Sequence, residues 1–92
     1  MSIFEGDVVL ATAGKEKGNL FIVWKMDGKF CFLVDGKRLK ITNPKKKSVK
    51  HLKKASKIAF PTEKLSEKEE KVNAEIRKFL KERKIYVETR CH

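Results

Sequence analysis

Short apolar segments separated by glycine-containing turn signals fill the first 36 residues, and they constrain the fold more than any other feature. The apolar runs are Val8–Ala11, Leu20–Trp24 and Phe30–Val34. Asp27-Gly28 separates the second run from the third, and Asp35-Gly36 follows the third. An Asp-Gly pair between apolar runs is typical of a tight β-hairpin turn. We therefore expect three short strands here, the second and third joined as a hairpin.

Two further strands are expected in the segment that follows. Arg38–Thr42 alternates basic or polar with apolar residues, which predicts a strand with Leu39 and Ile41 facing inward. Lys57–Phe60 is the candidate last strand. Five short strands at intervals of about 8–12 residues are typical of a small barrel rather than an open sheet. The expected fold class is mainly β with a C-terminal helix, the barrel occupying residues 1–62.

The last third of the chain has helical periodicity. Ser66–Glu69 matches a capping box, and Val72, Ile76, Phe79 and Leu80 form one apolar stripe. We interpret residues 63–84 as a helical region that covers one open end of the barrel, with the binding of a partner helix as the alternative. Asn73 is a weak helix former and a candidate break in this region, and residues 85–92 are a tail to which we assign no function.

Size and composition exclude several classes of function. A chain of 92 residues has room for one domain and little room for a large enclosed active site. No apolar run is long enough to span a bilayer, and the first residues do not resemble a secretory signal. Cys31 and Cys91 lack the spacing of a zinc site, and Cys31 is expected in the core. We predict a cytoplasmic protein that is not an enzyme, binds no cofactor or small-molecule substrate, and is a monomer when free.

The positive charge is concentrated in the middle of the chain. The net charge is +11, and residues 36–62 carry ten lysine or arginine residues and no acid. Such clustering favours binding to a polyanion, because neutralising phosphates releases their counterions. A solvated basic surface is the simpler alternative. An anionic membrane ranks below nucleic acid, because the segment lacks an amphipathic helix with a broad apolar face.

Gly6–Gly18 followed by Phe21-Ile22-Val23 resembles a KOW motif. Lys45–Leu52 and Asn73–Lys78 are similar to ribosomal large-subunit proteins of the fourteen-e family, and still more to their short bacterial relatives, the KOW-domain RNA-binding proteins. The resemblance covers about residues 5–82. It implies an SH3-like barrel in which the motif forms a strand, a loop and a second strand, with the loop contacting RNA.

These observations together predict an RNA-binding protein, with ribosomal RNA or the large ribosomal subunit as the partner. Lysines bind phosphates as point charges, whereas Arg38 is suited to a bidentate contact and His51 to stacking on a base. The alternatives are a protein-interaction module that docks a translation or transcription factor, and a KOW protein that binds double-stranded DNA. The predicted contact residues are Lys15, Lys17, Lys37, Arg38, Lys40, Lys45, Lys46, Lys47, Lys50, His51, Lys53 and Lys54.

Overall fold

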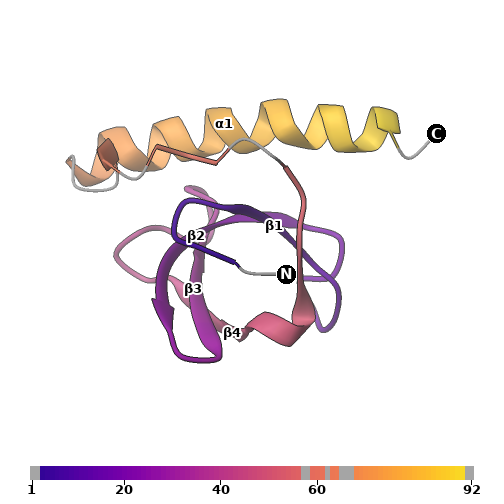
Figure 1. The fold of residues 1–92 in the computed structure, drawn as a ribbon. Helices are drawn as coiled ribbons and strands as arrows, with labels where there is room; N and C mark the ends of the chain where they lie inside the picture. The colour runs from indigo at the N-terminus through magenta and orange to yellow at the C-terminus, as the bar shows by residue number, and fades with distance from the viewer. Residues whose placement is uncertain (1–2, 57–58, 62, 65–67, 91–92) are drawn as a thin grey trace.

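A computed structural model describes residues 3–56, 59–61, 63–64 and 68–90, with side chains as far as residue 83. Five strands precede one long helix (Figure 1). The strands are β1 (Val8–Ala11), β2 (Leu20–Asp27), β3 (Phe30–Val34), β4 (Lys45–Ser48) and β5 (Leu52–Lys54). A short 3-10 helix, η1 (Val49–His51), joins β4 to β5, and the helix α1 spans Glu69–Arg90.

The strands form one antiparallel sheet in the order β4-β3-β2-β1-β5. Its first three strands were predicted: β1 and β3 have the expected bounds, and β2 extends three residues past Trp24 to Asp27. Asp27 pairs with Phe30 across the turn, as the Asp-Gly signal indicated. An irregularity in the register between Val23 and Lys25 interrupts the middle of this hairpin.

The sheet is strongly curved. The strands β4 and β5 lie at opposite edges of the sheet, yet only the three residues of η1 connect them. In a flat five-stranded sheet these edges would be about 19 Å apart. The link from Ser48 to Leu52 spans at most about 15 Å when fully extended, and η1 shortens it. The sheet therefore bends its edges toward each other, and Figure 1 shows the strands curling beneath α1.

Most side chains on both faces of β1, of the first half of β2 and of β3 are buried, which explains the continuous apolar runs in these strands. An inner cluster contains Val9, Phe21, Val23, Leu33 and Leu52, together with the buried Cys31 predicted for the core. An outer cluster combines Val8, Leu20, Ile22 and Val34 with Val72, Ile76 and Leu80 of α1. Trp24 is partly buried against the outer cluster.

The apolar stripe of the C-terminal region packs as predicted, but the helix differs in three respects. The helix α1 lies along the outer face of the sheet, so the expectation that it covers an open end was wrong. It is continuous through Asn73, which is buried and accepts a hydrogen bond from the Ile41 amide (3.2 Å). It also extends to Arg90, past the boundary expected at residue 84. The predicted capping box lies partly outside the described residues.

The two strands predicted after Val34 are not found where expected. Residues 38–42 form no strand, and Leu39 packs against the inner cluster and Ile41 against the outer one rather than on one common face. The fourth strand is instead the lysine run Lys45–Ser48, and the fifth is Leu52–Lys54. Of the predicted strand 57–60, residues 57–58 lie outside the described residues and 59–60 are not strand. Among the described helices, none is both long and apolar enough to cross a membrane.

Candidate nucleic-acid interface

The connection between β1 and β2, residues 12–19, is a loop with a fixed backbone. Ala11 and Gly18 close its base: the Gly18 amide donates to the Ala11 carbonyl at 2.9 Å, and the Ala11 amide donates to Asn19 at 3.1 Å. Gly14 has a φ of 78° and Gly18 of 90°, values that favour glycine. Lys15 and Lys17 are exposed on this 12–19 loop, and Glu16 between them is buried.

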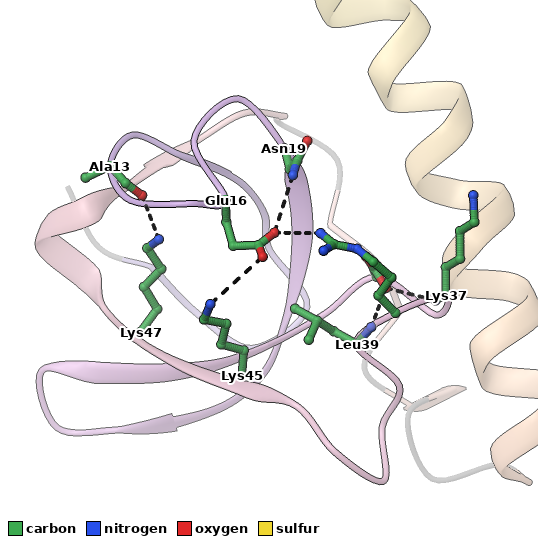
Figure 2. A network of polar contacts seen from close by, with 9 residues as sticks. Ala13, Glu16, Asn19, Lys37, Leu39, Lys45 and Lys47 are labelled. Atoms are coloured by element: carbon green, nitrogen blue, oxygen red, sulfur yellow. Dashed lines mark hydrogen bonds and ion pairs between the residues drawn. The ribbon is translucent and has the colours of Figure 1, made fainter.

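Glu16 is the centre of the polar network in Figure 2. Its Oε2 accepts a hydrogen bond from Arg38 Nη2 at 2.8 Å and another from Asn19 Nδ2 at 3.3 Å. Lys45 Nζ lies 3.9 Å from Oε1. Burial by itself raises the pKa of Glu16, but the hydrogen bonds from Asn19 and Arg38 and the charges of Arg38 and Lys45 outweigh it. The pKa of Glu16 is therefore lowered, and the carboxylate is charged at neutral pH.

Arg38 reaches Glu16 from the loop of residues 35–44, whose fold begins at Asp35. Asp35 Oδ1 accepts hydrogen bonds from the amides of Lys37 (2.8 Å) and Leu39 (2.9 Å). The Asp35 and Gly36 amides both donate to the Leu39 carbonyl. This side-chain-to-backbone pattern offers the chain an alternative to strand pairing, which is why the alternating Arg38–Thr42 pattern does not form a strand.

The helix α1 holds the 35–44 loop in place. Arg77 Nη1 donates to the Gly36 carbonyl at 2.6 Å, and Asn73 binds the Ile41 amide. Gly36 has a φ of 76°, and a β-carbon there would collide with the Asn73 carbonyl oxygen. Close approach of the loop to α1 thus requires glycine. Through Arg38 and Glu16, the helix indirectly positions the 12–19 loop.

The three lysines of β4 all have partners within the protein. Lys45 faces Glu16, and Lys47 Nζ donates to the Ala13 carbonyl at 2.7 Å, which ties β4 to the 12–19 loop (Figure 2). Lys46 Nζ lies 3.9 Å from Asp27 Oδ2 and 4.8 Å from the centre of the Phe30 ring. These lysines therefore have a structural role that the charge pattern did not reveal.

The basic residues after β4 lie on η1 and β5. The His51 carbonyl accepts a hydrogen bond from the Thr12 amide at 2.9 Å, so η1 adjoins the base of the 12–19 loop, and the His51 side chain is half-buried. Lys50 and Lys53 are exposed. Lys54 Nζ lies 3.7 Å from Oδ1 of the buried Asp7.

Apart from the half-buried His51, the predicted contact residues divide into two sets. Arg38, Lys45, Lys46, Lys47 and Lys54 are engaged by carboxylates or a carbonyl of the protein itself. The second set, here called the exposed lysines, forms no ion pair with any residue that the structure describes. The exposed lysines are Lys15, Lys17, Lys37, Lys40, Lys50 and Lys53.

Sequence reasoning missed the buried acids that organise this surface. Glu16 and Asp7 are 7 % and 4 % exposed, and neither is among the residues predicted for the site. The available signal was Glu16 itself, a single acid between two lysines in a loop bounded by Gly14 and Gly18. Asn73 and Arg77, which hold the 35–44 loop, have no such local signal, because their partners lie more than thirty residues away in the chain.

The described residues offer little support for nucleophilic catalysis by cysteine or for metal binding. Cys31 is fully buried, and burial raises the pKa of its thiol to about 11, so it is a poor nucleophile at neutral pH. No cluster of three or more His, Cys, Asp or Glu side chains suited to a metal ion occurs within the described part of the chain. Comparison with protein-family models and with curated protein sequences found no match.

Proposed function

We propose that this chain is a non-catalytic RNA-binding protein of the cytoplasm that contacts RNA phosphates through its exposed lysines. The observation that carries the proposal is the conformation of the 12–19 loop, which buries its one acid and exposes Lys15 and Lys17. A loop whose backbone is already fixed loses less conformational freedom when it binds. The target we propose is structured ribosomal RNA on the large subunit.

The distribution of charge supports a polyanionic partner. Residues 36–62 carry no acid, and the ion pairs that Glu16, Asp7 and Asp27 form with this segment engage only part of its positive charge. Lys37, Lys40, Lys50 and Lys53 remain exposed. Ammonium groups of this kind bind phosphates without reading sequence, so recognition would rest on the shape of the RNA backbone.

Arg38 has a narrower role in this proposal than its chemistry first suggested. Its Nη2 is used by Glu16, while 62 % of its side chain is exposed. A phosphate that approached the 12–19 loop would meet the remaining guanidinium nitrogens. Arg38 therefore links the loop to the RNA rather than acting as an independent bidentate reader.

A closed SH3-like barrel of the KOW type is part of the same proposal. The unit β1, 12–19 loop and β2 has the strand–loop–strand order of that motif, and the three-residue link between edge strands β4 and β5 favours closure. The resemblance to the fourteen-e family stays a prediction. It is the reason for naming ribosomal RNA rather than RNA in general.

Co-sedimentation of the tagged full-length chain with ribosomal particles tests the proposal. In sucrose gradients at low and raised salt, we expect the chain to migrate with the large subunit in both conditions. The double variant Lys15→Ala/Lys17→Ala should move toward the top of the gradient at the raised salt. Lys68→Ala/Lys78→Ala is the matched control, since it removes the same charge from two exposed positions, one directly before α1 and one within it.

Two further arms separate the alternatives. A complex with a partner protein would survive nuclease treatment, whereas an RNA complex would collapse. Competition between RNA and DNA duplexes at matched salt would identify a DNA-binding protein. A chain that stays at the top of the gradient in both salt conditions would contradict the ribosomal target.

A further inference from the structure

A groove of about 580 Å³ is lined by residues of η1, β5, the end of β2 and the segment before β1. Its apolar lining includes Ile3, Met26, Val49 and Leu52, all of which pack in or against the inner core cluster. The volume is within the range of about 300–1,000 Å³ found for small-ligand sites, so the groove is large enough for a planar ring system.

Phe4 stands at this groove with 63 % of its surface exposed. Phe4 is the most exposed of the described aromatic side chains; Phe30 follows at 43 %, and the others are buried or partly buried. The backbone of Phe4 is nevertheless fixed: the Phe4 amide donates to Asp7 Oδ2 at 2.8 Å, and the Asp7 amide donates to the Phe4 carbonyl at 3.1 Å. The protein therefore anchors this residue while leaving its ring accessible.

The polar side chains of the groove are all cationic. Lys50, Lys53 and Lys54 contribute to the lining, and no carboxylate does so among the described residues. Asp7, which holds the backbone of Phe4, also lies 3.7 Å from Lys54 Nζ. One buried acid thus positions both an exposed aromatic ring and an ammonium group at the same groove.

The groove adjoins the surface assigned above to RNA. The hydrogen bond from the Thr12 amide to the His51 carbonyl joins the base of the 12–19 loop to η1, and Lys50 of η1 lines the groove. The 12–19 loop that carries Lys15 and Lys17 and the 3-10 helix that carries Lys50 therefore meet at this hydrogen bond. This continuity favours a nucleic acid over an acidic peptide as the occupant.

We propose that the groove binds an unpaired nucleotide of the RNA, with its base stacked on Phe4 and its flanking phosphates against Lys50 and Lys53. The inference rests on the proposed RNA-binding function and deepens it, because phosphate contacts alone would not distinguish a bulged RNA from a continuous duplex. Aromatic side chains stack on any unpaired base, so the site selects an exposed base without selecting its identity.

Fluorescence anisotropy with two labelled RNAs tests the inference. One probe is a blunt 20-base-pair RNA duplex, and the other is the same duplex with a three-adenosine bulge. We expect the full chain to bind the bulged RNA more tightly. Phe4→Leu should weaken binding of the bulged RNA about 5- to 50-fold and leave duplex binding unchanged, and Phe4→Tyr should retain the preference. Phe30→Leu is the matched control, because Phe30 is exposed but does not line the groove.

The outcomes separate the inference from the proposed function. Equal affinity of wild type and Phe4→Leu for the bulged RNA would overturn the nucleotide site. If Lys15→Ala/Lys17→Ala still bound RNA more weakly than wild type, the proposed RNA-binding function would stand. No binding of either RNA by the wild-type chain would overturn both. If a labelled glutamate-rich peptide bound in a Phe4-dependent way and the bulged RNA showed no preference, the groove would be a peptide site and the inference would be wrong. Circular dichroism of each variant checks that it is folded.

Discussion

The 12–19 loop and the groove each depend on one buried acid, and the two acids act in different ways. Glu16 accepts side-chain hydrogen bonds from Arg38 and Asn19 and faces Lys45, so its charge is used to gather basic side chains from distant parts of the chain. Asp7 accepts a hydrogen bond from the Phe4 backbone at 2.8 Å, and its lysine partner is 3.7 Å away. Glu16 thus positions basic side chains, whereas Asp7 fixes the backbone of the residue that carries the exposed aromatic ring.

The comparison shows how a strongly basic chain can arrange its own charges. Ion pairs that are mostly exposed contribute little to stability, but a buried carboxylate with several partners fixes the loops that carry them. The lysines and the arginine that position the loops are thereby distinguished from the lysines left for a ligand. Charge density in the sequence does not make this distinction.

The largest expected effect comes from Gly36, which supports the 12–19 loop and not the groove. Gly36→Ala should cost about 2–4 kcal/mol in the free energy of unfolding, because it combines a positive φ with a collision against α1. Gly28→Ala is the control, since its φ is 60° but its β-carbon would meet open space, and about 1–2 kcal/mol is expected there. Urea denaturation measures both, and equal losses would show that the loop–helix contact is unimportant.

Neutralising each acid sharpens the comparison. Glu16→Gln should cost about 1–2 kcal/mol, because it weakens the charge-assisted bond from Arg38 inside a buried network. Asp7→Asn keeps an oxygen that can accept from the Phe4 amide and loses mainly the attraction of a partly exposed lysine, so less than about 1 kcal/mol is expected. A larger loss for Asp7→Asn than for Glu16→Gln would reverse the assigned roles.

A smaller effect is expected in the pH dependence of stability. The pKa of Glu16 is lowered in the folded chain from its ordinary value of 4.5. Its contribution is therefore fully present above pH 4.5 and is lost as the pH falls through the lowered folded pKa. The difference in unfolding free energy between wild type and Glu16→Gln should shrink over that acidic range. A difference that stays constant from neutral to acidic pH would contradict the account of Glu16.

Local sequence signals predicted the parts of the fold that local interactions determine. Val8–Ala11 and Phe30–Val34 were placed correctly because turn residues delimit apolar runs there. The strand at Lys45–Ser48 was missed because lysine is depleted in strands, and only pairing with β3, as in Phe32 with Lys46, places it in the sheet.

The sequence predicted which part of the chain carries the candidate site, but it did not predict how the side chains are arranged there. Its lysines follow from the charge map, but the separation into engaged and exposed side chains depends on Glu16 and its partner Arg38, 22 residues apart. Likewise, the backbone position of Phe4 rests on a hydrogen bond to the side chain of Asp7, which no local pattern indicates. Contacts between distant residues and the orientation of single side chains leave no periodic pattern in the sequence.

The salt dependence of RNA affinity tests the central claim that the exposed lysines bind phosphates. The slope of log K against log salt should decrease in magnitude by about 1.4–1.8 for Lys15→Ala/Lys17→Ala, and by a similar amount for Lys50→Ala/Lys53→Ala, since each lost contact removes about 0.7–0.9. The control Lys68→Ala/Lys78→Ala should keep the wild-type slope. If all three double variants gave the same slope as wild type, the exposed lysines would not be the RNA contacts.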